Sequence, residues 1–105
     1  MVTDLFLKYV TFDTQSDESS NTMPSTEGQM IFAREIVKQL QEIGLQDISL
    51  NENGYIMATL PANTDEAGIP AIGFIAHLDT SPDMSGRNVK PRVIDYQGGS
   101  IVLNE

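Results

Sequence analysis

The sequence PAIGFIAHLDT (residues 70–80) decides the fold class. Its first part, from Ala71 to Ala76, is apolar at every position and follows Pro70. A continuous apolar run of this length, bounded by turn signals, predicts a strand covered on both faces, as in the centre of an α/β sheet. We therefore predict an α/β protein in which this segment is the central strand.

The polar residues best suited to chemistry follow at the carboxyl end of that strand, where open α/β sheets bind their ligands. His77 is the only histidine, and Asp79 lies two positions later. In an extended backbone these side chains project from the same face. Asp79 is then able to fix one imidazole nitrogen and leave the other for a metal, a recurrent arrangement around zinc. Because His-x-Asp alone is a weak motif, a hydrogen-bonded or partly exposed histidine without a metal is the alternative.

An amphipathic helix is expected at the start of the chain. Apolar residues form one helical stripe from Val2 to about Phe12, and Thr3 or Asp4 could cap it. The following stretch, residues 13–23, is rich in Ser, Thr, Asp and Asn, whose side chains compete for backbone hydrogen bonds. We predict a loop there.

A second helix is expected after Pro24. Thr26 and Gln29 have the spacing of a capping box, and Gly44 suits the left-handed position that ends a helix. The apolar stripe between them consists of Phe32, Ala33, Ile36, Val37, Leu40 and Ile43.

A hairpin is expected between this helix and the central strand. Strands over Asp47–Leu50 and Tyr55–Leu60 flank Asn53 and Gly54, a dipeptide that strongly favours a hairpin turn. Beyond Asp79 the chain is predicted to be irregular, apart from a short β-prone run over Ser100–Leu103.

Composition excludes several classes of function. With 6 basic and 15 acidic residues the net charge is −9, which argues against nucleic acid and anionic membranes as partners. No apolar run approaches the roughly 20 residues that cross a bilayer, and no secretion signal is recognisable, so we expect a cytoplasmic location. The absence of cysteine rules out disulfides and thiolate metal sites.

Other catalytic motifs are missing from the sequence. It has no Gly-x-Ser-x-Gly elbow, no His-Glu-x-x-His helix and no Gly-rich phosphate loop. Asp83 and Arg87 follow the candidate site closely. They either contact a substrate or form surface salt bridges.

Around the candidate site, residues 69–83 resemble the peptidase T family, the tripeptide aminopeptidases among the co-catalytic two-zinc exopeptidases. Further blocks are similar to that family at residues 9–16, 24–29, 57–63, 85–91 and 96–99. The resemblance covers nearly the whole chain, and together these blocks are much more specific than His-x-Asp.

The resemblance implies that His77 ligates one of two zinc ions and that Asp79 orients His77. It implies removal of the amino-terminal residue from tripeptides by a metal-activated water and a glutamate base. The implied fold is a three-layer α/β domain with a mixed central sheet flanked by helices. Residues 1–105 would be its incomplete amino-terminal part, with no second domain present. In the family, the remaining metal ligands and the base lie beyond residue 105.

Two expectations follow for the isolated chain. A catalytic zinc takes three protein ligands, so one histidine and no cysteine predict an inactive polypeptide. A central strand without its later neighbours leaves unpaired edges, which predict self-association by strand exchange. The alternatives are a related zinc deacylase, dipeptidase or carboxypeptidase, or a non-catalytic module in which His77 is structural.

Overall fold

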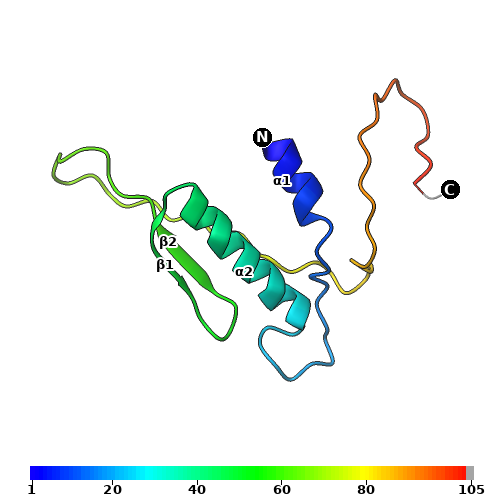
Figure 1. Cartoon of the computed structure of the whole chain (residues 1–105), viewed down its shortest axis with the longest axis horizontal. Helices are drawn as coiled ribbons and strands as arrows, with labels where there is room; N and C mark the ends of the chain where they lie inside the picture. The colour runs from blue at the N-terminus through cyan, green and yellow to red at the C-terminus, as the bar shows by residue number, and fades with distance from the viewer. Residues whose placement is uncertain (104–105) are drawn as a thin grey trace.

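The computed structural model describes residues 1–103, and its regular elements all lie in the first 60 residues (Figure 1). In chain order they are α1 (Val2–Tyr9), α2 (Glu27–Glu42), β1 (Gln46–Leu50) and β2 (Ile56–Thr59). The two strands form an antiparallel sheet that packs on α2, mainly through β1. The combination of helices and sheet confirms a mixed α/β class, whereas the three-layer domain stays a prediction.

The first helix is shorter than predicted, because α1 ends at Tyr9 and the residues up to Phe12 form turns. Its cap also differs from the prediction. Met1 is the N-cap residue, and its amino group donates a hydrogen bond to the Asp4 carboxylate at 2.8 Å. Asp4 therefore lies inside the first turn, where a negative charge interacts favourably with the amino end of a helix.

The second helix begins and ends as predicted, but the capping box does not form. Thr26 is the N-cap residue, and its hydroxyl donates to the Gln15 carbonyl at 3.0 Å. Gln29 donates to the Thr14 carbonyl at 3.4 Å. Both side chains thus hold the preceding loop instead of each other's backbone amides. At the other end Gly44 has φ +85°, which confirms it as the terminator.

The small core is centred on α2. Phe32 and Ala33 are the buried apolar residues of the described chain, with 7% and 0% exposure. The Tyr9 ring meets Phe32 edge-on at a centroid distance of 5.1 Å, and the Phe12 ring lies 4.9 Å from Phe32. These aromatic contacts attach the end of α1 to α2.

The predicted hairpin is confirmed, with β1 beginning one residue earlier than expected and β2 shorter than expected by one residue at each end. Gly54 has φ +83° in the turn. The Asn51 side-chain oxygen accepts hydrogen bonds from the amides of Asn53 and Tyr55, at 3.1 and 2.9 Å. Half-buried Ile56 and Ala58 alternate with exposed residues, as the sequence pattern predicts.

The predicted central strand is wrong for this structure. Residues 71–76 form no strand, and Phe74 and Ile75 are 94% and 101% exposed. A strand needs neighbours that satisfy its backbone groups, and in residues 1–103 the sheet contains β1 and β2 alone. The predicted run over Ser100–Leu103 likewise forms no strand. The apolar pattern thus identifies a segment suited to burial without supplying the partners that would bury it.

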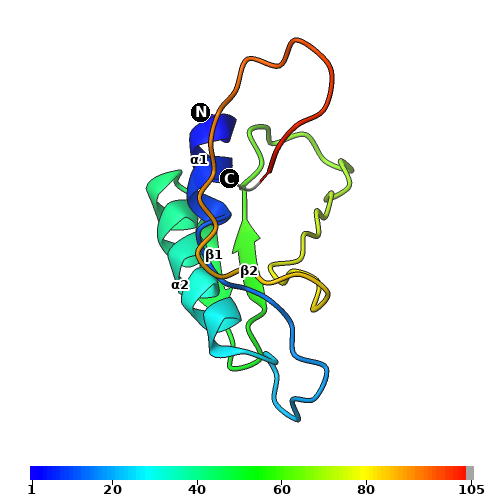
Figure 2. The same ribbon diagram turned by 90° about the vertical axis from the view of Figure 1, so that its right-hand side faces the viewer.

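The chain is consequently extended. Its radius of gyration is 17.6 Å, compared with about 13 Å for a compact domain of this length. The segment between β2 and residue 80 runs out beyond the hairpin and returns, and the residues after 85 form a separate arm (Figures 1 and 2). Neither helix of the described chain is long and apolar enough to cross a membrane.

Candidate functional site

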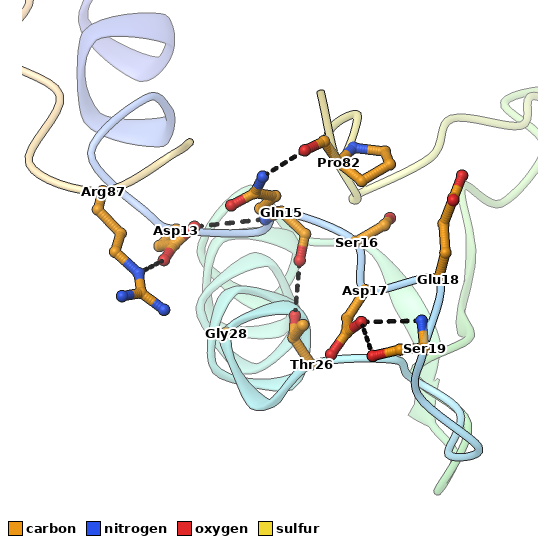
Figure 3. A pocket seen from close by; sticks show the side chains of 10 residues that line it. All are labelled: Asp13, Gln15, Ser16, Asp17, Glu18, Ser19, Thr26, Gly28, Pro82 and Arg87. Carbon is orange, nitrogen blue, oxygen red and sulfur yellow. Dashed lines mark hydrogen bonds and ion pairs between the residues drawn. The ribbon is translucent and has the colours of Figure 1, made fainter. Parts of the chain in front are cut away.

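The loop after α1 meets the segment that carries His77 and Asp79. Gln15 and Thr80 form an isolated parallel bridge. In it, the Ser16 amide donates to the Thr80 carbonyl at 2.9 Å, and the Thr80 amide donates to the Thr14 carbonyl at 3.1 Å. The Gln15 side-chain amide also donates to the Pro82 carbonyl at 2.7 Å (Figure 3). The segment from Thr80 to Pro82, which follows the predicted strand, is therefore held in place although the strand itself does not form.

The same loop is anchored on the amino end of α2. Thr14 is 3% exposed, and its carbonyl accepts the hydrogen bond from Gln29 described above. The Asp13 carbonyl lies directly against Gly28, where there is no room for a side chain. The loop is consequently a fixed support between α2 and the candidate site. The loop predicted for residues 13–23 is confirmed here, but its composition does not indicate this supporting role.

The two predicted site residues contact each other. His77 Nδ1 lies 3.1 Å from the Asp79 carboxylate oxygen Oδ1 and 2.8 Å from the Asp79 backbone oxygen. The His77 side chain is 84% exposed, and within residues 1–103 no hydrogen bond occupies its Nε2 atom. This agrees with the spacing argument that brings the pair together. The role of either residue at a metal stays a prediction.

The Asp79 carboxylate has a second partner that the sequence did not indicate. The Ser16 hydroxyl donates a hydrogen bond to Asp79 Oδ2 at 2.8 Å. This bond is the largest cause lowering the pKa of Asp79. The contact with His77 lowers the pKa further, and partial burial opposes both effects. The signal in the sequence was the resemblance block at residues 9–16, which ends at Ser16.

A polar pocket of about 680 Å³ adjoins this support (Figure 3). It is lined by Asp13, Gln15, Ser16, Asp17, Glu18, Ser19, Thr26, Gly28, Pro82 and Arg87. Arg87 forms an ion pair with Asp13 at 3.3 Å, and Asp83 accepts a hydrogen bond from Ser81 at 2.8 Å. Hydrogen bonds from the Ser19 hydroxyl and amide lower the pKa of Asp17. For Arg87 these contacts favour the surface salt bridge over a substrate contact.

The side chains present fit one ligand position of a metal centre. A neutral imidazole with one nitrogen held by a carboxylate is a suitable zinc ligand, and His77 has this arrangement. In the described part of the chain, however, no group of three or more His, Cys, Asp or Glu side chains is arranged to hold a metal ion. Residues 1–103 therefore contain a single imidazole and no complete metal site.

Comparison with known sequences finds close relatives over nearly the full chain. Peptidase T of Parabacteroides distasonis is 68% identical over 103 residues, which cover 98% of this chain and 25% of the relative. Peptidase T of Caldanaerobacter subterraneus subsp. tengcongensis is 61% identical, covering 99% and 25%, and that of Clostridium novyi is 55% identical, covering 99% and 26%. The chain thus spans about a quarter of the length of these curated relatives. No family model matches the chain.

Proposed function

The chain is a peptidase T sequence across the quarter of those proteins that it spans, and from this premise we propose that it is part of a zinc-dependent tripeptide aminopeptidase. The name peptidase T, which these relatives share, supports the proposal that the protein is a peptidase. The finer assignment, release of the amino-terminal residue from tripeptides, comes from the family resemblance at residues 69–83. The absence of cysteine is in keeping with the cytoplasmic location that we also propose.

The observation that carries the proposal is the contact between His77 and Asp79. With Nδ1 held by the Asp79 backbone oxygen at 2.8 Å and by the Asp79 carboxylate at 3.1 Å, the Nε2 atom is left as the proposed ligand atom. In our proposal His77 holds one of two zinc ions, and Asp79 fixes the tautomer and orientation of the ring. Zinc bound there would supply Lewis-acid stabilisation and an activated water. The remaining ligands would have to come from outside residues 1–103.

We further propose that the 105-residue chain does not hydrolyse tripeptides by itself, because His77 alone cannot complete a catalytic zinc site. The test is an assay of the purified chain on a tripeptide with added zinc. No release of the amino-terminal residue is expected. Turnover that disappears in the His77→Ala variant would contradict this part of the proposal.

A chimera tests the family function directly. The matching quarter of the Parabacteroides distasonis peptidase T is replaced by this chain, which is 68% identical to it. We expect tripeptide hydrolysis and bound zinc in the chimera. His77→Ala should abolish hydrolysis and reduce the zinc content, whereas Asn63→Ala, in an exposed loop, should change neither. Full activity of the His77→Ala chimera would refute the proposed ligand.

The same chimera separates the peptidase from the related deacylases, dipeptidases and carboxypeptidases. Tripeptides should be cleaved at the amino-terminal residue, and acylated amino acids and dipeptides should be poor substrates. A preference for an acylated amino acid would favour the deacylase instead.

A further inference from the structure

We propose that Ser16 is a positioning residue, which acts on His77 by fixing the Asp79 carboxylate. The chemical purpose of this arrangement rests on the proposed function, since it matters to catalysis only if His77 is a ligand. The arrangement itself rests on contacts within this chain. It adds to the His77–Asp79 pair a third member that lies 63 positions away from Asp79 in the sequence.

The Asp79 carboxylate needs partners on both oxygens to keep one orientation. An ionised carboxylate only accepts hydrogen bonds, and a single bond leaves it free to turn about its Cβ–Cγ axis. Asp79 is half exposed, so water competes for any oxygen that has no fixed partner. Here Oδ1 faces His77 and Oδ2 accepts the Ser16 hydroxyl at 2.8 Å. The two contacts on different oxygens fix the plane of the carboxylate.

Ser16 itself is held in place by its backbone. Its amide donates to the Thr80 carbonyl at 2.9 Å, next to Asp79 in sequence. The preceding Gln15 donates to the Pro82 carbonyl, and Thr14 is buried against α2. The hydroxyl is therefore presented by a bridge to the same segment that carries the carboxylate. A group fixed in this way loses little further freedom when it forms its hydrogen bond.

The contacts of Nδ1 determine which nitrogen of the His77 imidazole carries the proton. A neutral imidazole carries its proton on one nitrogen, and the partner of that nitrogen decides which one. Nδ1 faces two acceptors, the Asp79 backbone oxygen at 2.8 Å and the carboxylate oxygen Oδ1 at 3.1 Å, and both favour the proton on Nδ1 and the lone pair on Nε2. If the carboxylate turns, one of these two acceptors is lost, so the preference weakens and the ring gains rotational freedom. Ser16 thus influences His77 without touching it.

The test uses a pair of variants with the same shape. Ser16→Thr keeps the hydroxyl, whereas Ser16→Val replaces it with a methyl group and leaves the backbone bridge to Thr80 available. Ser20→Ala is the control, because Ser20 lies in the same loop and contacts Thr22 instead of Asp79. Because His77 is the only histidine, long-range ¹⁵N–¹H correlation spectra of the labelled 105-residue chain report its tautomer without ambiguity. Spectra are recorded at alkaline pH.

We expect the Nδ1–H tautomer to predominate in the original chain, in Ser16→Thr and in Ser20→Ala. Ser16→Val should shift part of the population towards Nε2–H, while the Asp79 backbone oxygen still accepts a hydrogen bond from Nδ1 in the remainder. Backbone amide spectra establish that each variant keeps the bridge to Thr80. The inference is overturned if Ser16→Val has the same tautomer population as Ser16→Thr, or if Ser20→Ala shifts the population equally.

A second arm measures zinc in the chimera described above. Partners that touch a ligand directly change metal affinity by roughly 10- to 100-fold. Ser16 acts one residue further away, so Ser16→Val should weaken zinc binding by about tenfold at most, and Ser16→Thr should restore it. If the chimera is inactive but the tautomer depends on Ser16, the proposed function fails and the positioning inference stands. If the chimera is active and the tautomer population does not depend on Ser16, the proposed function stands and the positioning inference fails.

Discussion

Gly28 lies so close to the backbone of Asp13 that an added Cβ atom would stand 1.9 Å from the Asp13 carbonyl oxygen and 3.1 Å from its carbon. These are backbone atoms, which cannot swing aside as a flexible side chain does. The contact joins the first turn of α2 to the loop that carries Thr14 and Ser16. It explains how a loop rich in serine and aspartate holds a fixed position.

Replacing this glycine should therefore loosen the support of the candidate site. Glycine to alanine inside a helix normally stabilises by up to about 1 kcal/mol, but we expect Gly28→Ala to destabilise the chain by about 1–3 kcal/mol, as overpacking does. Urea unfolding measures the loss, and amide exchange at Thr80 reports the bridge. Gly44→Ala is the comparison, because nothing lies within 4 Å of Gly44 and its φ is +85°. Gly44→Ala should lower the free energy of unfolding by about 1–2 kcal/mol, because alanine is strained at this left-handed backbone conformation. The Thr80 amide should stay protected from exchange. A Gly28→Ala chain more stable than the original would contradict the contact.

Two phenylalanines give a matched test of the small core. Phe32 is 7% exposed and packs against Tyr9 and Phe12, whereas Phe74 is 94% exposed. Phe32→Ala should cost about 3–5 kcal/mol, and Phe74→Ala should change stability by less than about 0.5 kcal/mol. Chemical denaturation of both variants checks this. Equal losses would mean that the segment around Phe74 is buried in solution.

The attachment of α1 to α2 should depend on pH through Glu35. Its hydrogen bond with Lys8 is the main cause that lowers the Glu35 pKa below the ordinary 4.5, and the same bond raises the Lys8 pKa above 10.5. A depressed carboxyl pKa stabilises the folded chain above pH 4.5, and this contribution is lost as the pH falls through the folded pKa. A raised lysine pKa acts in the opposite sense, so its contribution is lost above pH 10.5.

Thermal unfolding of the Glu35→Gln variant measures this contribution. Its melting temperature should lie below that of the original chain at neutral pH, and the difference should vanish in acid. Lys38→Met serves as control, because Lys38 lies 3.9 Å from Glu35 at an exposed position and contributes little. A difference that persists well below pH 4.5 would show that the effect is not electrostatic.

The exposed apolar segment should make the chain self-associate. Ile72, Phe74 and Ile75 project into solvent from a segment without strand partners, and unpaired backbone next to apolar side chains favours pairing with another chain. We expect sedimentation to detect oligomers that Ile75→Lys reduces. Ile43→Lys, at a position that is 70% exposed after α2, should have a smaller effect. A single monomeric species at high concentration would argue against this expectation.

The elements that the sequence predicts well are those defined by neighbours in the chain. The stripe through Phe32, the terminator Gly44 and the turn at Asn53 and Gly54 all depend on local spacing. The structure has the terminator and the turn, and the stripe is buried or half-buried from Phe32 to Leu40, whereas its last predicted member, Ile43, lies after α2 and is exposed. The pairing of His77 with Asp79 is local in the same sense, because two positions in an extended backbone share one face.

The features that the sequence does not predict depend on contacts between distant segments. Thr26 and Gln29 have the spacing of a capping box, yet their hydrogen bonds go to the loop before α2, which no local rule anticipates. The apolar run from Ala71 to Ala76 indicates a buried strand, but burial needs neighbours that local pattern cannot supply. Ser16 belongs to the same group, since only the bridge between Gln15 and Thr80 brings its hydroxyl to Asp79.

That bridge also imposes an order on assembly during translation. A ribosome that adds roughly 5–20 residues per second needs several seconds to proceed from Gln15 to Thr80. In that interval α1, α2 and the hairpin, whose contacts are shorter in range, have time to form. The two helices and the hairpin would thus fold before His77 leaves the ribosome. When the His77 segment follows, Ser16 would already lie in the folded part of the chain.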